Sequence, residues 1–220
     1  MTKKLGLIHT SATLVPIFQK LVEKHLSGKD IQVFNIVDDS LIKNTIERGA
    51  LTEDTSRRVV DYVGSAEAAG ADYILVTCSS IGSAVETSAT LSTVPVLRVD
   101  LPMADKAVEM GSRIGVLATL STTLEPTSDL VRRRADFAGK KIELISRLCE
   151  GAFEALMQGK PEVHDDMVAS ALKELSQQVD VILLAQASMA RVIDQLADDE
   201  KKVPIITSPE LAIEHIAKML

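Results

Sequence analysis

An internal repeat constrains the fold of this chain more than any other feature of its sequence. Residues 5–10 (LGLIHT) resemble residues 114–119 (IGVLAT) in the second half of the chain. Three further pairs of segments follow in the same order, 28–33 with 139–144, 72–76 with 180–184, and 94–96 with 203–205. Because the separation between the two partners is nearly the same in all four ordered pairs, we predict that the chain is a duplicated half.

The hydrophobic pattern of each half predicts strands that alternate with helices. The buried strands expected in the first half lie at 5–8, 31–37 and 73–77. A charged helical stretch at about 52–69 ends at Gly70, which is a common residue just after a helix. This alternation is typical of a parallel sheet flanked by helices. We therefore expect an α/β fold of two pseudo-symmetric lobes, 1–99 and 100–207, each built on a mainly parallel sheet.

Composition excludes several classes of function. With 220 residues, 46% of them hydrophobic, the chain can bury a core in one unit or in two small lobes. Its net charge of −7, low aromatic content and lack of Trp argue against binding to nucleic acid, and the one basic run, Arg132–Arg134, is interpreted as the solvated side of a helix. No apolar run approaches the roughly 20 residues of a membrane-spanning helix, and no signal peptide is recognised, so we expect a cytoplasmic protein without membrane partners.

The residues that directly follow each predicted strand are the candidates for a site, because open α/β sheets bind ligands beyond the carboxyl ends of their strands. Small hydroxyls dominate this set, and such donors suit a small carboxylate better than a large apolar ligand. The set comprises His9, Thr10, Ser11, Asp38, Asp39, Cys78, Ser79 and Ser80 from the first half and Thr119, Ser121, Thr122, Cys149, Glu150, Gln186, Ala187 and Ser188 from the second. If the two halves face each other, we expect these residues to line one cleft.

Cys78 is the candidate reactive group. It stands where a predicted strand ends and a helix begins, and the positive end of the helix dipole is expected to lower its pKa from the free value of about 8.5. Its polar neighbours Thr77, Ser79 and Ser80 also favour a functional thiol, whereas the alternative is a buried and inert one. With two cysteines and no export signal, Cys78 and Cys149 are expected to be free rather than bridged.

The segments Thr77–Ser80, 115–119 and 184–190 resemble the Asp/Glu/hydantoin racemase superfamily, which also contains maleate isomerases and arylmalonate decarboxylase. The resemblance covers nearly the whole chain. It implies two pseudo-symmetric lobes with the site between them and a C-terminal segment, 208–220, that packs back on the first lobe. It also implies chemistry without a cofactor, pyridoxal phosphate included, at the carbon next to a carboxylate. In the racemases each lobe gives one cysteine and the two act from opposite faces; the first corresponds to Cys78.

The second cysteine has no counterpart in this chain, because its position is Gln186, a residue that neither titrates nor acts as a nucleophile. Since a two-base racemase needs a proton-transfer group for each face, Cys149 and His9 are considered as replacements. Cys149 aligns near Asp38, at a strand end, but it could instead fill a gap in the core. His9 also follows a strand, and its alternative is a histidine that only forms hydrogen bonds. The segment 164–166 (HDD) is interpreted as the polar face of a helix rather than a metal site.

The remaining strand-end residues are expected to bind the substrate carboxylates and to stabilise the charge that develops during reaction, with helix capping as their alternative role. These residues are Thr10, Ser11, Asp38, Ser79, Ser80, Thr119, Ser121, Thr122, Ala187 and Ser188. No nucleotide-binding or metal-binding motif occurs in the chain, so neither a cofactor nor a metal is predicted.

The leading hypothesis is a racemase or isomerase that acts at the carbon alpha to a carboxylate of a small amino acid or dicarboxylate, with Cys78 as acid/base. A homo-oligomer, a dimer, is expected. The first alternative is a single-cysteine decarboxylase or lyase of the arylmalonate decarboxylase type, in which Cys78 protonates a planar enediolate after loss of CO₂. Addition of Cys78 to an activated double bond, a small-carboxylate binding protein without turnover, and a cysteine hydrolase are the other options.

Overall fold

The computed structural model describes residues 2–197 and 200–220, and the chain divides into two compact lobes. Lobe 1 comprises Met1–Leu101 and Pro209–Leu220, and lobe 2 comprises Pro102–Ser208. The sequence placed the two boundaries after residues 99 and 207, and the structure has them after residues 101 and 208. The C-terminal segment therefore belongs to lobe 1 rather than to the lobe that precedes it in the chain.

Lobe 1 is built on a four-stranded parallel sheet with the strand order β2-β1-β3-β4. Its strands are β1 (Lys3–His9), β2 (Ile31–Val37), β3 (Tyr73–Val76) and β4 (Val96–Arg98). Its helices are α1 (Leu14–Leu26), α2 (Ser40–Arg48), α3 (Glu53–Ala68), α4 (Gly82–Leu91) and α10 (Ser208–Met219), and the 3-10 turn η1 (Ser79–Ile81) leads into α4.

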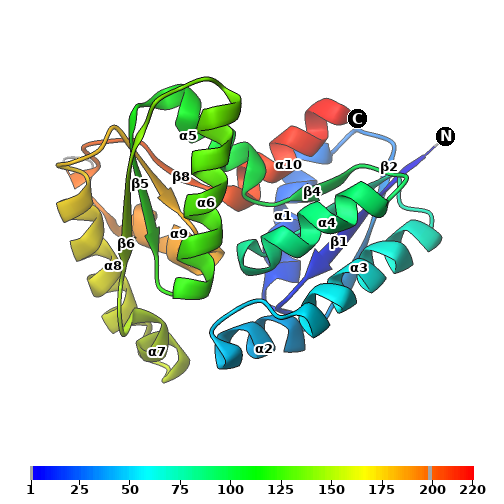
Figure 1. Ribbon diagram of the computed structural model, residues 1–220, viewed down its shortest axis with the longest axis horizontal. Helices are drawn as coiled ribbons and strands as arrows, with labels where there is room; N and C mark the ends of the chain where they lie inside the picture. The colour runs from blue at the N-terminus through cyan, green and yellow to red at the C-terminus, as the bar shows by residue number, and fades with distance from the viewer. Residues whose placement is uncertain (1, 198–199) are drawn as a thin grey trace. The chain divides into compact units, whose positions relative to one another are not determined.

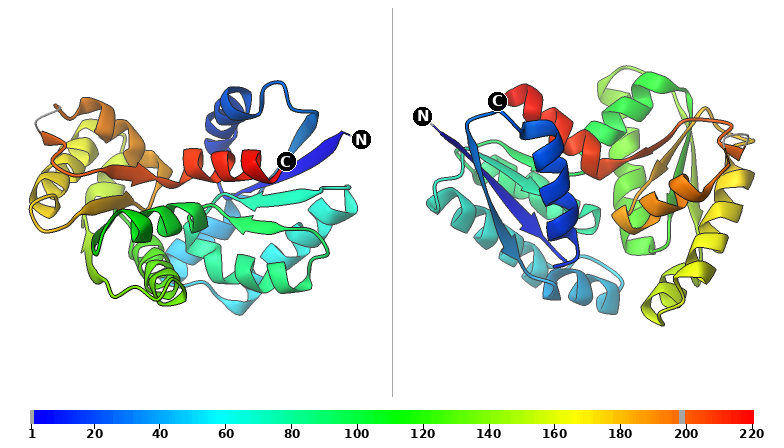
Figure 2. Two further views of the ribbon diagram at one scale, coloured as in Figure 1. Left: turned by 90° about the horizontal axis from the view of Figure 1, so that it is seen from above. Right: turned by 180° about the vertical axis from the view of Figure 1, so that it is seen from behind.

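Helices cover both faces of the lobe 1 sheet. Phe18 of α1 and Ile213 of α10 pack with Leu7 of β1 on one face, and Figure 2 shows α10, in red, beside the blue β1 and α1. Val59 of α3 and Val85 of α4 belong to a second apolar cluster on the other face. Because both faces are covered, the central residues of β1 and β3 are apolar and buried, as a buried parallel sheet requires.

Lobe 2 repeats this plan with the strand order β6-β5-β7-β8, again all parallel. Its strands are β5 (Arg113–Ala118), β6 (Glu143–Leu148), β7 (Val181–Leu184) and β8 (Ile205–Thr207). Its helices are α5 (Leu101–Met110), α6 (Ser121–Phe137), α7 (Ala152–Met157), α8 (Pro161–Leu175) and α9 (Ala190–Gln195), and the 3-10 turn η2 (Ala187–Met189) leads into α9. In Figure 1, α8 and α6 lie on opposite sides of the strands of this lobe.

The sequence repeat reproduces the strand registers of the two sheets. Leu5 of β1 lies opposite Tyr73 of β3, and their repeat partners, Ile114 of β5 and Val181 of β7, lie opposite each other in the second sheet. The other strand pairs correspond in the same way. The pair Val76–Arg98 of lobe 1 corresponds to the pair Leu184–Thr207 of lobe 2. The pair His9–Val37 of lobe 1 corresponds to the pair Ala118–Leu148 of lobe 2. The predicted α/β fold with two pseudo-symmetric lobes is confirmed.

The structure confirms one predicted helix of lobe 1 and adds a short one that the sequence analysis did not predict. The stretch predicted at 52–69 is α3, and Gly70 ends it with a positive φ of 86° and a hydrogen bond to the carbonyl of Glu67. The nine-residue α2 was not expected, because only Leu41 and Thr45 of this helix are buried and its apolar pattern is correspondingly weak.

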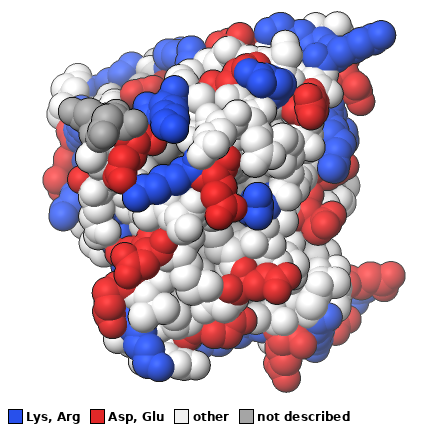
Figure 3. Space-filling model, turned by 90° about the vertical axis from the view of Figure 1, so that its left-hand side faces the viewer, with Lys and Arg blue, Asp and Glu red and all other residues white. Residues whose placement is uncertain are grey.

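Charged side chains of both signs are interspersed over the face of the molecule drawn in Figure 3. Arg132 and Arg133 are exposed on α6, as predicted, and Arg133 pairs with Asp129 one turn away at 2.7 Å. Among the described helices, none combines the length and the apolar content that a bilayer crossing would need.

Candidate functional site

The residues predicted for the site lie at the carboxyl ends of the strands in each lobe. In lobe 1, His9 ends β1, Asp38 follows β2, and Cys78 follows β3. In lobe 2, Thr119 follows β5, Ser121 and Thr122 open α6, Cys149 follows β6, and Gln186 follows β7. Because the strands of each sheet are parallel, these ends share one edge of their own lobe, which we call its carboxyl edge. The expectation that the two edges line one cleft stays a prediction.

Cys78 is the residue that joins β3 to η1. Its backbone is extended, with φ −137° and ψ 122°, and the residue as a whole is partly exposed although its sulfur is buried. Hydrogen bonds reach its sulfur from the Thr10 side chain, from the backbone N–H groups of Ser80 and Ile81, and from the Ser80 side chain. A thiol placed in this way meets several donors at a strand end, whereas the sequence analysis expected Thr10 and Ser80 to bind the substrate.

The pKa of Cys78 is raised, and the expectation of a lowered pKa was wrong. Burial of the sulfur is the largest cause, because an apolar surrounding disfavours the thiolate. The hydrogen bonds from Thr10, Ser80 and Ile81 oppose this effect without outweighing it. The helix-dipole argument failed because it weighed the local backbone alone, whereas the packing around β3 sets the larger desolvation cost.

A buried ion pair supports the turn that carries Cys78. The guanidinium group of Arg98, at the end of β4, donates to both carboxylate oxygens of Asp100 at 2.7 and 2.9 Å and to Glu86 of α4. Arg98 is 4% exposed and Asp100 is fully buried. A Cβ atom on Gly82, the first residue of α4, would stand 2.4 Å from the guanidinium carbon. A larger residue at the start of α4 would therefore displace the guanidinium group that Asp100 and Glu86 hold.

His9 is fully buried, and both of its ring nitrogens have partners within lobe 1. Its Nδ1 lies 2.9 Å from the hydroxyl of Thr77, and its Nε2 lies 2.9 Å from Oδ1 of Asn35. Burial lowers the pKa of His9, although the hydrogen bond to Asn35 opposes the shift. With both nitrogens occupied, His9 fits the structural alternative, and we do not carry its acid/base role into the proposed function.

The polar atoms of Asp38, like those of His9, already have hydrogen-bond partners within lobe 1. Its carboxylate accepts hydrogen bonds from the hydroxyl of Tyr62 at 2.6 Å and from Ser40, and it pairs with Arg58. Burial tends to raise the pKa of Asp38, but these donors hold it below its usual range. The carboxylate therefore ties α2 and α3 to the end of β2, and it is a poor acceptor for a further ligand.

Cys149 lies in the apolar core of lobe 2 and is 6% exposed. Burial raises its pKa to about 11, against a smaller opposing effect of Arg147. A thiol with this pKa is almost fully protonated at neutral pH, so the structure favours the gap-filling alternative that the sequence left open.

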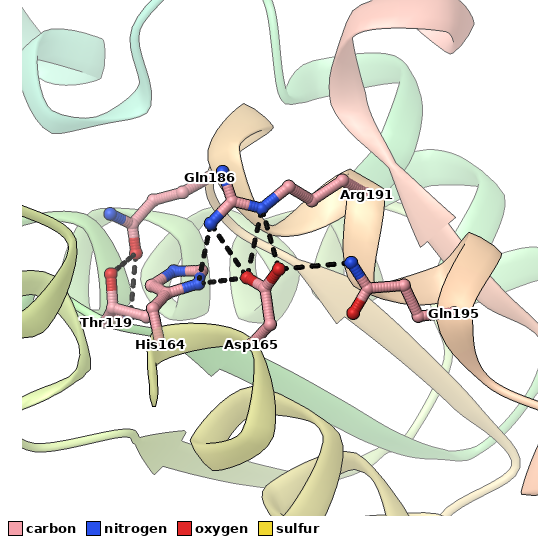
Figure 4. A network of polar contacts seen from close by, with 6 residues as sticks. All are labelled: Thr119, His164, Asp165, Gln186, Arg191 and Gln195. Carbon is pink, nitrogen blue, oxygen red and sulfur yellow. Dashed lines mark hydrogen bonds and ion pairs between the residues drawn. The ribbon is translucent and has the colours of Figure 1, made fainter. Parts of the chain in front are cut away.

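Gln186 occupies the position in lobe 2 that Cys78 occupies in lobe 1. Its Oε1 accepts hydrogen bonds from the backbone N–H of Thr119 at 2.6 Å and from the Thr119 hydroxyl at 3.0 Å. These two bonds fix the amide, and Figure 4 shows its nitrogen on the side turned away from Thr119. A fixed amide of this kind presents N–H donors and no titratable group.

A histidine that the sequence did not single out as a site residue stands at the same edge of lobe 2. His164 lies in the first turn of α8 and has no exposed surface. Its Nδ1 is 2.7 Å from Oδ1 of Asp165, and this carboxylate also accepts hydrogen bonds from Arg191 at 2.8–3.0 Å and from Gln195 at 3.2 Å (Figure 4). The interpretation of 164–166 as a solvated polar face is wrong for His164 and Asp165, which are both buried, and holds for the exposed Asp166.

The protonation of the His164 ring follows from its partner. Burial tends to raise the pKa of Asp165, but hydrogen bonds from Arg191, His164 and Gln195 hold it below its usual range. Since an ionised carboxylate only accepts hydrogen bonds, the proton of a neutral His164 ring is on Nδ1. Nε2 is buried and has no hydrogen-bond partner among the described residues, an arrangement that costs about 1–3 kcal/mol and calls for a functional explanation.

The hydroxyls of the predicted site differ in exposure. Thr10, Ser79, Ser80 and Thr119 are buried, whereas Ser11, Thr122 and Ser188 are partly exposed and Ser121 is exposed. In the described part of the chain, the group of possible metal ligands that comes together is His25, Glu210 and Glu214, where α1 meets α10. Lys24 and His25 already bind Glu210 there, so this cluster is an ion-pair network of lobe 1, away from the strand ends.

Comparison with known proteins agrees with this architecture. The family model described as Asp/Glu/Hydantoin racemase matches residues 5–216. No curated protein matches the sequence well enough to count as a relative.

Solved structures with the same fold cover almost the whole chain. A candidate Asp/Glu racemase from Yersinia pestis superposes with a TM-score of 0.77 at 19% identity, over 99% of this chain and 98% of that one. The aspartate racemase of Picrophilus torridus gives 0.72 at 16% identity, over 98% and 94%, and the allantoin racemase of Klebsiella pneumoniae gives 0.67 at 14% identity, over 99% and 87%. At these identities the likeness shows the fold, and the match of the family model shows the relationship: the chain belongs to the Asp/Glu/hydantoin racemase family.

Proposed function

We propose that the protein is a cofactor-independent racemase or isomerase that acts at the carbon alpha to a carboxylate of a small amino acid or dicarboxylate, with Cys78 as an acid/base group. The observation that carries this proposal is the placement of Cys78 at the end of β3, where its sulfur is surrounded by the donors of Thr10, Ser80 and Ile81. Membership in the racemase family supports the reaction class.

In the proposed reaction, the Cys78 thiolate takes the proton from the alpha carbon and becomes a thiol. The electron pair of the broken C–H bond moves into the carboxylate, which becomes an enediolate, and fixed hydroxyl and N–H donors stabilise its charge. The raised pKa of Cys78 makes the thiolate less abundant at neutral pH but more basic, which helps it to remove a proton from carbon.

We assign the carboxylate-binding role of lobe 2 to the first turn of α6 and to Gln186. A helix of 17 residues presents the positive end of its dipole to an anion, and Ser121 and Thr122 add hydroxyls to this turn. The Gln186 amide, held by Thr119, adds N–H donors. This arrangement replaces the thiol expected in the racemases with a group that binds and does not titrate.

A single-thiol decarboxylase or lyase is the second candidate, and the raised pKa of Cys78 is the observation that favours it. A thiol that is protonated at neutral pH is ready to act as an acid. After a malonate-like acid loses CO₂, Cys78 would give its proton to the enediolate that remains, and the resulting thiolate would recover a proton from water. Such a reaction needs no proton-transfer group in place of Gln186.

The test uses the separate enantiomers of aspartate and glutamate, together with substituted malonates, in deuterated water. We expect deuterium at the alpha carbon and loss of optical rotation, and we expect Cys78→Ala to slow both by about 10²–10⁴-fold. Cys149→Ala is the matched control and should keep its rates within a few-fold, because Cys149 lies in the core. Release of CO₂ from a malonate without racemisation of any amino acid would replace the first candidate with the second.

Turnover that survives in Cys78→Ala would contradict both candidates. Protection of Cys78 from alkylation by malonate, with no exchange from any acid, would instead indicate a binding protein without turnover. The dimeric state and the cytoplasmic location expected from the sequence stay predictions, which analytical ultracentrifugation and fractionation of cells would check.

A further inference from the structure

We propose that His164 is the acid/base group of lobe 2, acting through Nε2 where the racemases of this family use a second thiol, and that Asp165 and Arg191 position its ring. This inference rests on the proposed function, because it assigns a second proton-transfer group to the same reaction. It uses a histidine that does not align with the position of the missing cysteine, which is Gln186.

The topology of lobe 2 brings His164 to the carboxyl edge. Helices α7 and α8 connect β6 to β7, and α8 runs back toward the start of β7, so its first turn lies on the side of the strand ends. Val168, Leu172 and Leu175 of α8 pack into the core on the sheet, and His164 continues this stripe one turn earlier. The imidazole therefore reaches the edge where Thr119 and Gln186 stand, and Figure 4 shows the ring between Asp165 and the Thr119–Gln186 pair.

The contacts of the ring prepare Nε2 for proton transfer. The carboxylate of Asp165 accepts the Nδ1 proton at 2.7 Å and is itself fixed by Arg191 and Gln195. The approach of Arg191 Nη2 to Nδ1, at 3.5 Å, is too long to compete with this bond. The neutral ring then carries an unshared electron pair on Nε2, which no described residue satisfies.

Proton transfer at this atom balances without any other reagent. As a base, Nε2 takes the alpha proton and the ring becomes an imidazolium, whose charge the Asp165 carboxylate stabilises. As an acid, the imidazolium returns a proton from Nε2 to the alpha carbon of the enediolate, and the neutral ring with its Nδ1–H remains. The position is screened from water, which strengthens the contacts that hold the ring.

His9 provides the internal comparison. It is equally buried, but its Nε2 is bonded to Asn35 and its Nδ1 to Thr77, so it has no free atom to offer to a ligand. The Thr77 hydroxyl that meets Nδ1 of His9 also donates to the carbonyl of Ile8 at 3.2 Å, so the ring of His9 belongs to a closed hydrogen-bond network within lobe 1. His164 differs from it in having one ring nitrogen without a partner among the described residues.

The first test needs no substrate. Nitrogen-15 NMR of the imidazoles in the full-length protein should show His164 with its proton on Nδ1, and the variants His164→Asn and His9→Gln assign the signals of the two buried rings. Addition of malonate should shift the Nε2 resonance of His164 and leave His9 unchanged. A His164 ring with its proton on Nε2, or one that does not respond to malonate, would overturn the inference.

The second test measures exchange of the alpha proton with deuterium for each enantiomer separately. We expect His164→Asn to slow interconversion about 100-fold or more, while one enantiomer still exchanges its alpha proton through Cys78. In Asp165→Asn we expect a smaller loss together with a change of the His164 tautomer, which is the signature of a positioning residue. Circular dichroism establishes that the variants are folded.

The outcomes separate the inference from the function on which it rests. If folded His164→Asn interconverts the enantiomers within three-fold of the wild-type rate, His164 is not the acid/base group. The same conclusion follows if this variant loses exchange equally from both enantiomers. In either case the proposed role of Cys78 is unaffected. If the wild-type protein exchanges no alpha proton from any acid tested, the proposed function fails, and the acid/base role of His164 fails with it.

Discussion

Cys78 in lobe 1 and Gln186 in lobe 2 stand at equivalent points, and their backbones are nearly identical. The φ and ψ angles are −137° and 122° at Cys78 and −134° and 136° at Gln186. A 3-10 turn of three residues follows in each lobe, and the next helix begins at Gly82 or Ala190 with the same φ of −57°. The backbone of the turn is therefore a property of the duplicated fold and does not depend on the chemistry of the side chain.

The side chains around the two turns follow different plans. In lobe 1, Arg98 lies beneath Gly82 and pairs with Asp100, whereas lobe 2 has Thr207 at the register position of Arg98. The described buried side-chain atoms that lack a hydrogen-bond partner are Thr122 Oγ1, Thr127 Oγ1 and His164 Nε2, and all belong to lobe 2. The described buried atoms that lack a hydrogen-bond partner are therefore concentrated in lobe 2, to which we assign carboxylate binding in the proposed function.

Removal of the buried cation of lobe 1 should give the largest change in stability. Arg98→Met leaves the fully buried Asp100 without its partner, and we expect the free energy of unfolding to fall by about 3–5 kcal/mol. Denaturant titration followed by circular dichroism measures the loss. Arg113→Met in lobe 2 is the control, because solvent screens the exposed Arg113–Asp180 pair and its loss should change the stability far less. Equal losses in the two variants would contradict the contrast between the lobes.

A methyl group at Gly82 should have the next largest effect. The added Cβ would meet a guanidinium group that Asp100 and Glu86 hold in place, and we expect Gly82→Ala to cost about 1–3 kcal/mol and to change the alkylation rate of Cys78. Gly64→Ala, within α3, is the control, since no atom lies within 4 Å of its added Cβ and the change should stabilise the protein by about 0.5–1 kcal/mol. A Gly82→Ala protein as stable as the wild type would show that Arg98 does not restrict the turn.

The smallest effect concerns the pH dependence of lobe 1, which has His9 where lobe 2 has Ala118. Burial lowers the pKa of His9 in the folded protein below the unfolded value of about 6.5, so the unfolded chain binds more protons in that range. The contribution of His9 to stability is therefore complete above about pH 6.5 and is lost as the pH falls through the lowered pKa. Unfolding measured between pH 7.5 and pH 5 should show a flatter profile for His9→Gln than for the wild type. If the dependence of stability on pH is the same in His9→Gln and in the wild type, His9 does not contribute to it.

The repeat in the sequence predicted more of the fold than the individual strand patterns did. The nearly constant separation between repeated segments identifies the equivalent strands, and their registers correspond in the two sheets because the segments that connect parallel strands absorb small changes in length. The same alignment placed Gln186 opposite Cys78, and the matching backbone angles of the two residues agree with it.

The candidate site was less predictable, because its chemistry depends on contacts between segments far apart in the chain. Asp38 and His9 follow their strands as expected, but Tyr62, Arg58, Asn35 and Thr77 occupy their polar atoms. His164 was assigned to a polar face because its neighbours in sequence are acidic. The spacing of His164, Val168, Leu172 and Leu175, which is that of one helix face, is the signal that would have placed it inside.

The sequence by itself determined a duplicated α/β chain, the strand that ends at Cys78 and the absence of a thiol at the equivalent position in the second half. These properties follow from the hydrophobic periodicity of single segments and from the alignment of the two halves, and both can be read from the order of residues in the chain. Tertiary structure alone decided that burial raises the pKa of Cys78 and that other side chains occupy the polar atoms of His9 and Asp38. It also decided that Asp165 binds one ring nitrogen of His164 and that no described residue binds the other. Desolvation and hydrogen-bond partners are set by what packs against a group, and no pattern within one segment records them.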